Sequence, residues 1–301
     1  MNKYLIVFLS ALIISYLLTP LIKKFSLYFG ILDIPGPAKL HRVPVARAGG
    51  LAILAGFIFG VFLMVLNKMI PLTHLRAIVF GGTIISVLGL LDDIKGVSFI
   101  EKFIVQLSAA VLIVISGIRV GYIPYYLSIP ITVIWIVGVT NAINLMDGMD
   151  GLASGISFFA GLAFFVLGLI RGDLLLSILS LALAGSCLGF LRHNFSPASI
   201  FMGDTGSLFL GFMLSVIGVI STMNIRSPIN LFVPVLILGI PVFDTLLIMY
   251  RRFLGHQHIF MPDRGHFYDI ILDSRKFTYE QVVLLVYVFS ILLGVSSLCL
   301  I

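Results

Sequence analysis

The chain has 301 residues, of which 60% are hydrophobic and 11% charged, and its mean hydropathy is +1.17. Soluble proteins of this length carry more charge, so the composition excludes a soluble globular class and predicts a polytopic membrane protein. The net charge of +6 does not indicate nucleic-acid binding, because the basic residues lie beside apolar runs. In that position they can contact anionic lipid headgroups. Both cysteines lie within apolar runs and imply no disulfide framework.

Ten apolar runs approach the length of about 20 residues that a membrane span needs. We therefore predict an all-α fold of about ten transmembrane helices in a single integral-membrane domain, residues 1–301. Lys23 and Lys24 follow the first run, whereas a signal peptide carries its charge before it, so we expect a retained first span. The expected spans are 4–22, 48–67, 75–91, 103–120, 128–145, 155–170, 174–191, 205–223, 229–250 and 279–301.

The Lys and Arg residues divide unequally between the two sides of the membrane. Thirteen lie in the loops after spans 1, 3, 5, 7 and 9, and six lie on the other side. This asymmetry predicts a cytoplasmic location for the first set of loops and an outside location for both termini. All acids except Asp173 also lie on the inner side. We therefore expect a multi-pass protein of the cell membrane whose active site is formed by the cytoplasmic loops.

The first two inner loops contain candidate phosphate-binding and metal-binding groups. In the loop 33–50, prolines alternate with the bases Lys39, His41, Arg42 and Arg47, which suit an anionic headgroup or act only as a topology signal. In the next loop, Asp92 and Asp93 are adjacent at the end of a span. Paired carboxylates repel each other unless a cation lies between them. With Lys102 nearby, they predict a metal and phosphate site, and the alternative is a solvated helix end.

The third inner loop, 140–153, contains two amides and two acids that are each three residues from the next. Residues three apart lie on one side of a helix, and Gly148 and Gly151 predict a break that folds the second acid back toward the first. We expect a compact group of oxygen ligands at the membrane edge, whereas ordinary helix capping would need only one such residue. The four residues are Asn141, Asn144, Asp147 and Asp150.

The fourth inner loop opens the eighth span with the sequence Gly203-Asp204-Thr205-Gly206-Ser207. Asp204 near a helix N-terminus, between glycines, indicates a site that favours phosphate, and the alternative is a simple N-cap. Asn194, in the same loop, is a supporting candidate. Asp244 lies inside the ninth apolar run, where an acid either faces a polar cavity and has a function or pairs with an arginine.

The fifth inner loop carries His256, His258 and His266, which resemble a zinc set only loosely because no tight histidine pair is present. Arg264 and His266 are better interpreted as phosphate-binding cations. Together, the loops offer hard oxygen ligands that favour Mg²⁺ or Mn²⁺, with basic residues beside them. A metal ion and cations placed together are typical of phosphoryl-transfer sites. No P-loop is present, so we do not expect an ATPase.

Five segments, in this order, resemble the polyprenyl-phosphate N-acetylhexosamine-1-phosphate transferases over essentially the whole chain. They are DDIKG with KFIVQ, NAINLMDGMDGLA, FMGDTGS, PVFDT with RR, and the PDRGH loop. The first-loop sequence HRVPVARAGG looks more like the N-acetylglucosamine branch, which starts O-antigen and teichoic-acid chains, than like the muramoyl-pentapeptide branch.

The resemblance implies transfer of an N-acetylhexosamine 1-phosphate, most simply that of GlcNAc, from a UDP-sugar to undecaprenyl or another polyprenyl phosphate, with release of UMP. It implies Mg²⁺ held by Asp204 and Asn144. It also implies a uridine pocket and diphosphate ligands. The uridine pocket would include Gly148, Met149, Asp150 and Phe201, and the diphosphate ligands would be Lys102 and Arg264.

Asp92, supported by Asp93, is the candidate for orienting or deprotonating the lipid phosphate, and Asp204 completes the catalytic set. Asn141, Asp147 and Asn194 are expected to support them. Many members of the family carry three histidines where this chain has His266-Phe267-Tyr268-Asp269, which leaves the identity of the sugar open. The alternatives are a muramoyl-pentapeptide-phosphate transferase and, from another class, an acid-dependent transporter. The oligomeric state, a homodimer included, also stays open.

Overall fold

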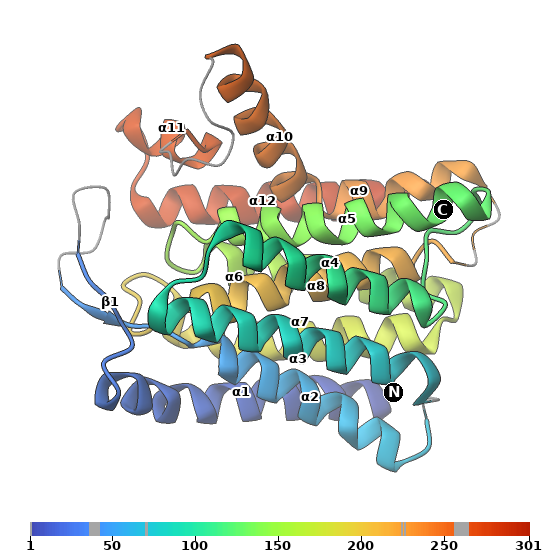
Figure 1. Ribbon diagram of the computed structural model, residues 1–301, viewed down its shortest axis with the longest axis horizontal. Helices are drawn as coiled ribbons and strands as arrows, with labels where there is room; N and C mark the ends of the chain where they lie inside the picture. Colours follow the sequence, from blue (N-terminus) through green and yellow to red (C-terminus); the bar gives the residue numbers. More distant parts are fainter. Residues whose placement is uncertain (1, 36–42, 70–71, 224, 226, 256–264) are drawn as a thin grey trace.

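The computed structural model describes residues 2–35, 43–69, 72–223, 225, 227–255 and 265–301. This part of the chain is almost entirely helical and forms one bundle of roughly parallel helices, from which α10 and α11 project (Figure 1). The elements are α1 Asn2–Tyr28, β1 Leu32–Asp33, β2 Val45–Ala46, α2 Gly50–Leu66, α3 Leu72–Lys95, α4 Phe99–Ile115, α5 Tyr125–Leu145, α6 Leu152–Arg171, α7 Leu174–Asn194, α8 Gly203–Ile220, the 3₁₀ turn η1 Pro228–Leu231, α9 Phe232–Ile237, α10 Gly239–Leu254, α11 Phe267–Asp273 and α12 Tyr279–Leu298.

The all-α membrane fold predicted from the sequence is confirmed, but the number of spans differs from ten. All ten predicted runs are helical, yet within the described residues seven helices are long and apolar enough to cross a membrane, or eight if the bent pair α9–α10 is one span. Helices α2 and α4 have 17 residues each. At 1.5 Å per residue they reach about 26 Å, less than the roughly 30 Å of a hydrocarbon core.

The ninth predicted span is broken rather than continuous. Helices α9 and α10 meet at an angle of 81° on either side of Leu238. Pro241 follows in the first turn of α10 and has no N–H to continue the hydrogen-bond ladder of α9. Beyond this break, α10 projects from the bundle while still contacting α5 and α12 (Figure 1).

Helix α8 lies at the centre of the bundle, with 94% of its length buried. Helices α2, α3 and α5 pack directly against it. Two glycines allow this close approach at its N-terminus: a Cβ on Gly50 would lie 2.1 Å from the Gly206 nitrogen, and one on Gly89 would lie 2.3 Å from the Asp204 carbonyl oxygen. Such contacts between helix backbones fix the N-terminus of α8 and therefore the position of Asp204.

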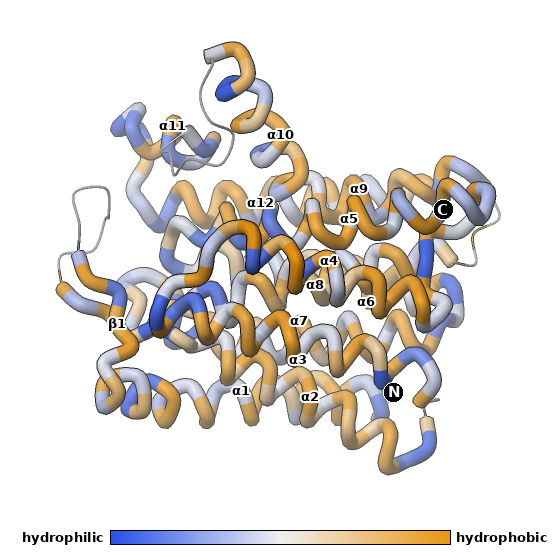
Figure 2. Tube along the Cα trace, viewed as in Figure 1, coloured by the Kyte–Doolittle hydropathy of each residue, from blue (hydrophilic) through white to orange (hydrophobic). Residues whose placement is uncertain are grey.

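The loops at one end of the bundle are tied together. Strands β1 and β2 pair antiparallel in the first loop, and the backbone of residues 46–50 hydrogen-bonds with residues 201 and 202, just before α8. Figure 2 shows hydrophilic residues gathered at this end and apolar residues along the helices. Both termini lie at the opposite end (Figure 1). The structure thus places the predicted inner loops together and the termini on the other side.

Candidate active site

Lys102 joins two carboxylates that are far apart in the sequence. Its Nζ lies 2.5 Å from the Asp92 Oδ2 and 2.9 Å from the Asp204 Oδ2. Asp92 lies in the last turn of α3 and Lys102 in the first turn of α4, which opens with a capping box of Ser98 and Glu101. The side chains of Lys102, Asp92 and Asp204 are 23%, 14% and 17% exposed, so this triad is only partly open to solvent. The predicted proximity of Lys102 to the acidic pair is confirmed for Asp92.

Asp93 points away from Lys102 and caps α8. Its Oδ1 accepts the backbone N–H of Asp204 at 2.9 Å, and its Oδ2 accepts the N–H and hydroxyl of Thr205 at 3.1 and 2.7 Å. The side chain is fully buried. Both carboxylate oxygens therefore bind the first turn of α8, where Asp93 holds Asp204 in place, and the catalytic role that Asp93 was expected to share with Asp92 stays a prediction.

Arg47 connects this acidic cluster to the first loop. Its guanidinium lies 3.5 Å from Asp33, 3.4 Å from Asp93 and 4.0 Å from Asp204. Burial alone would lower its pKa, but the surrounding acids, Asp93 foremost, raise it above the ordinary value. From the sequence, Arg47 was only one of several loop bases. The signal that could have singled it out is the adjacent Gly49-Gly50 pair, which lets the loop backbone touch α8.

The four polar residues after α5 spread in different directions. Asn141 forms a reciprocal amide pair with Gln106 of α4, and Asn144 donates to the Ser207 hydroxyl of α8 at 2.8 Å. Asp150 accepts the Ala198 N–H at 2.8 Å. The prediction of one compact group is therefore wrong for Asn141, whereas Asp150 lines the same cavity as Asp147 and lies within its electrostatic reach, as predicted. Each step of three residues on a helix turns the side chain back by about 60°, so Asn141 and Asn144, both in α5, face different neighbours.

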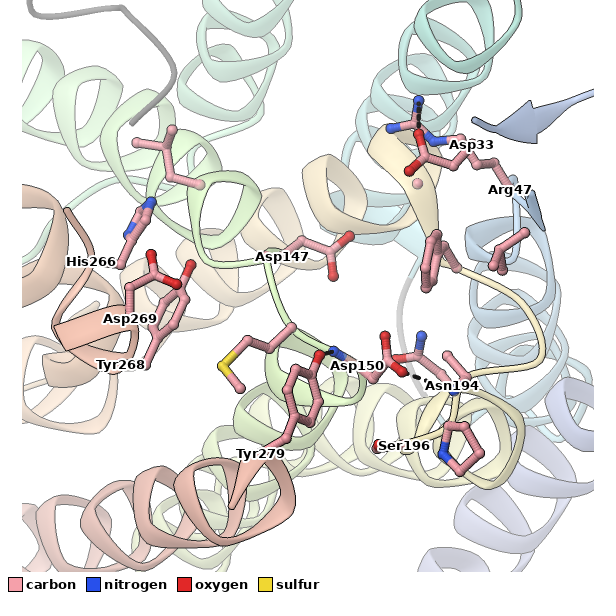
Figure 3. Close-up of a pocket in the computed structure, with 18 of the residues that line it drawn as sticks. Asp33, Arg47, Asp147, Asp150, Asn194, Ser196, His266, Tyr268, Asp269 and Tyr279 are labelled. Atoms are coloured by element: carbon pink, nitrogen blue, oxygen red, sulfur yellow. Dashed lines mark hydrogen bonds and ion pairs between the residues drawn. The ribbon is translucent and has the colours of Figure 1, made fainter. Parts of the chain in front are cut away.

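Asp147 projects into the space between these elements (Figure 3). Its carboxylate has no hydrogen-bond or ion-pair partner in the part of the chain that the structure describes. Burial first, and then the charges of Asp204, Asp93 and Asp150, raise the pKa of Asp147 well above its ordinary value, and Arg47 only partly opposes this. A partly buried carboxylate beside other acids is a group that a bound cation would stabilise.

A cavity of about 890 Å³ adjoins the cluster, which is within the usual range for small-molecule sites. The four residues predicted for the uridine pocket, Gly148, Met149, Asp150 and Phe201, all line it. The backbone N–H of Asp150 donates a hydrogen bond to the Tyr279 hydroxyl. The other lining residues include Asp33, Arg47, Asp147, Asn194, Ser196, Gly203, His266, Tyr268, Asp269 and Tyr279 (Figure 3).

Asn194 holds the floor of this cavity together. Its Oδ1 accepts the Gly151 N–H at 3.2 Å and the Ser154 hydroxyl at 2.9 Å, and its Nδ2 donates to the Ile200 carbonyl at 3.2 Å. Gly151 has φ +79°, a left-handed conformation that glycine adopts without strain. Asn194 therefore links the start of α6 to the loop before α8, in agreement with its predicted supporting place.

His266 also lines the cavity, and it pairs with Asp244 of α10. The ion-pair partner that the described residues give Asp244 is thus a histidine, whereas the sequence had suggested an arginine or a polar cavity. Arg264, the other predicted diphosphate ligand of this loop, lies outside the described residues. So do His256, His258 and the bases Lys39, His41 and Arg42 of the first loop.

The oxygen donors of this cluster suit a Mg²⁺ ion that has few protein ligands. No group of three or more His, Cys, Asp and Glu side chains is arranged as a metal cage among the described residues. Mg²⁺ typically binds one or two carboxylates and completes its shell with water and substrate phosphates. Asp204 supplies a carboxylate, the unpartnered Asp147 lies within its electrostatic reach, and the Asn144 amide oxygen is left available because its nitrogen binds Ser207.

Comparison with known proteins agrees with this arrangement. The family model described as glycosyl transferase family 4 matches residues 75–222. A probable undecaprenyl-phosphate N-acetylglucosaminyl 1-phosphate transferase of Bacillus subtilis (strain 168) is 36% identical over 100% of this chain and 86% of its own. A decaprenyl-phosphate N-acetylglucosaminephosphotransferase of Mycobacterium tuberculosis (strain ATCC 25618 / H37Rv) is 33% identical over 95% and 80%.

A phospho-N-acetylmuramoyl-pentapeptide-transferase of Desulforamulus reducens is 32% identical over 96% of this chain and 94% of its own. These relatives confirm the family resemblance that the sequence motifs suggested. The chain therefore belongs to glycosyl transferase family 4 and is a membrane-embedded transferase of phosphosugars.

Proposed function

We propose that the protein transfers N-acetylglucosamine 1-phosphate from UDP-N-acetylglucosamine to a polyprenyl phosphate at the cytoplasmic face of the cell membrane. An oxygen of the lipid phosphate attacks the sugar-side phosphorus of the donor. The bond between that phosphorus and the bridging oxygen breaks, and UMP leaves with the bridging oxygen. The polyprenyl-diphospho-sugar that remains in the membrane would start a cell-envelope polysaccharide. The relatives of B. subtilis and M. tuberculosis are named as N-acetylglucosamine-phosphate transferases of undecaprenyl and decaprenyl phosphate, which supports this choice of sugar and acceptor.

The observation that carries the proposal is the Lys102 bridge between Asp92 and Asp204 beside the 890 Å³ cavity. The cavity has a polar loop at Gly148 for a nucleotide, and the bridge supplies the cation and carboxylates for its phosphates. The bridge lies at the loop end of an apolar bundle, where a lipid phosphate can approach from the membrane while the donor enters from water. A soluble sugar transferase would have no need of this placement.

The residues around the bridge divide the work. Lys102 would move from its carboxylates to the donor diphosphate when substrate binds, since an ammonium is a good phosphate ligand. Asp92 accepts the Val97 N–H as well as Lys102, so both of its oxygens are engaged and it serves to orient Lys102 more than to take a proton. A lipid phosphate is already largely ionised near neutral pH, so direct in-line attack does not need a strong base.

Mg²⁺, with Mn²⁺ as a substitute, would be held by Asp204 and Asn144, and Asp147 has the position to join them. When bound, it would offset the charge that builds up on the transferred phosphoryl group. Arg47 keeps Asp204 in place from the opposite side. Asp93 keeps the first turn of α8 rigid, so that Asp204 does not move when the cation binds.

The test is UMP release from purified protein in detergent, with Mg²⁺, polyprenyl phosphate and a panel of UDP-N-acetylhexosamines. We expect UMP release that depends on the lipid and is lost when the metal is chelated. Asp204→Asn should abolish turnover and leave the protein folded, because it removes charge from a partly exposed position. Retained activity of this variant in Mg²⁺ would refute the metal assignment.

Other outcomes separate the remaining candidates. A preference for UDP-N-acetylmuramoyl-pentapeptide would place the chain with the D. reducens relative. Release of UDP would mean that the sugar alone is transferred, which would refute the proposal. Solute uptake into vesicles without UMP release would favour the transporter.

A further inference from the structure

Asp244 is a fully buried carboxylate outside the Lys102 cluster, and it does not line the cavity. A buried charge needs compensating partners. Asp244 has two: its Oδ2 lies 2.6 Å from the His266 Nδ1, and its Oδ1 accepts the backbone N–H of Phe267 at 3.0 Å. Both partners stand at the start of α11, so the carboxylate of α10 caps the next helix and binds the residue that precedes it.

Helix α11 depends on such contacts for its position. It has seven residues, too few to be stable alone. Its start is fixed to α10 at two places, by Asp244 and by Arg251, whose guanidinium donates to the Gly265 carbonyl at 3.0 Å. The Arg251 contact is exposed, whereas the Asp244 contact is buried. The buried, charge-assisted contact should therefore contribute most of the restraint.

The restraint continues from His266 to the wall of the cavity. The His266 ring stacks on the Tyr268 ring, with centroids 4.9 Å apart and planes 9° from parallel. Tyr268 is 1% exposed and packs in an apolar cluster with Met146 and Met149. Its hydroxyl lies 2.7 Å from the point where a Cβ on Gly148 would be. The stacked Tyr268 ring therefore contacts the Gly148 loop, which lines the proposed nucleotide site.

The same contact orients the imidazole. Because Nδ1 faces Asp244, Nε2 is the ring nitrogen left for a ligand, and His266 lines the cavity. Figure 3 shows His266, Tyr268 and Asp269 on one wall, opposite Arg47 and Asp33. Asp244 itself has both oxygens occupied by α11. It is thus unsuited to act as a transport acid or a proton acceptor for substrate.

We infer that Asp244 is a positioning residue for the sugar-nucleotide donor: through His266 and the first turn of α11, it holds Tyr268 against Gly148 and directs His266 into the cavity. This inference rests on the proposed function for the identity of the donor. The Asp244 contacts reach the cavity at His266 and Gly148, where the nucleotide of the donor is expected, whereas the lipid phosphate is expected at Asp92, which does not line the cavity.

The test compares Asp244→Asn with Asp273→Asn. Both remove one negative charge next to α11, but Asp273 is the exposed last residue of that helix. Asp244→Asn keeps the size of the side chain and loses the charged partner of His266. We expect the KM for UDP-N-acetylglucosamine to rise about tenfold or more, as for loss of a hydrogen bond to a charged group. The KM for polyprenyl phosphate should stay within about twofold, and Asp273→Asn should behave as wild type.

A purely structural role would give a different result. If Asp244 only stabilised the fold, Asp244→Asn would lower the melting temperature and affect both KM values alike. A double variant decides whether Asp244 acts through His266: Asp244→Asn combined with His266→Asn should be no worse than His266→Asn alone. Additive losses would overturn the inference. If Asp244→Asn does not fold, His266→Asn breaks the same contact from the other side and is tested for the same shift in donor KM.

Donor binding without the lipid acceptor separates this inference from the proposed function. Equilibrium binding of UDP-N-acetylglucosamine is measured for the wild type and both Asp variants. If the wild type binds donor but releases no UMP, the proposed reaction fails, and weaker binding by Asp244→Asn than by Asp273→Asn still supports positioning. Equal binding by the two variants overturns the inference even where turnover is normal. Absence of donor binding by the wild type overturns both.

Discussion

Adjacent aspartates of α3 offer the sharpest test of how the site is built, because the same substitution should have different effects at Asp92 and Asp93. Asp93→Asn replaces one carboxylate oxygen with an amide nitrogen. That nitrogen must face either the Asp204 N–H or the N–H of Thr205, since Asp93 accepts from both. A buried N–H left without an acceptor costs about 1–3 kcal/mol. Loss of the negative charge at the N-terminus of α8 adds about 0.3–1 kcal/mol.

The total of roughly 1–4 kcal/mol should lower the melting temperature by roughly 3–15 °C, at about 2–4 °C per kcal/mol for a chain of somewhat smaller size. Activity should fall as well, because Asp204 loses its fixed position. Asp92→Asn should instead reduce activity with a melting temperature near that of the wild type, since the Asp92 side chain is 14% exposed and keeps an acceptor for Val97.

The melting assay can use the protein's own thiols. Cys187 is buried in α7 and Cys299 is exposed. In a Cys299→Ser background, a thiol-reactive dye therefore reports when α7 opens on heating in detergent. Because unfolding of membrane proteins in detergent is often irreversible, the variants are compared at one scan rate. An Asp93→Asn protein that melts with the wild type and is inactive would refute the capping role and return Asp93 to the reacting groups.

Three further outcomes follow from the same geometry. Lys102→Ala should raise the KM for the donor, because it removes the cation beside Asp204; unchanged KM and kcat would exclude it from the phosphate site. Gly89→Ala should destabilise the protein, since its Cβ would lie 2.3 Å from the Asp204 carbonyl, whereas Gly138→Ala, with nothing within 4 Å, should be neutral or stabilising in melting scans. Burial raises the pKa of Asp147, so its ionisation costs folding free energy above about pH 4. Asp147→Asn should therefore raise the melting temperature of the metal-free protein at neutral pH and lose this advantage near about pH 3, where both states of the wild type are protonated; an advantage that persists there would contradict the assigned cause.

The ninth predicted span shows a difference between what the local sequence pattern predicts and what the tertiary structure contains. Its apolar run predicts one helix through the membrane, and the residues are indeed helical on both sides of Leu238. The 81° bend was not predicted, although Gly239 and Pro241 stand at the break. A proline can be accommodated in a straight or kinked span when neighbouring groups satisfy the backbone. The packing of α9 against α12, and of α10 against α5 and α12, decides the angle.

What the sequence determined by itself was local in origin. Apolar runs specify helices and a membrane environment because hydrophobicity and helix formation act over neighbouring residues. The motifs at Asp92, Asn144 and Asp204 indicated a phosphosugar transferase through their resemblance to a known family, and such motifs can be recognised because their residues lie close together in the sequence.

Tertiary structure alone decided which groups share a partner. The Asp93 carboxylate caps Asp204 across 111 positions of sequence, and Asn141 turns to Gln106 instead of joining Asn144. Arg47 gained its place among three acids because glycines let two backbones touch. Such contacts depend on how helices pack and on where each side chain emerges around a helix. Both are properties of the assembled bundle, which no short stretch of the chain contains.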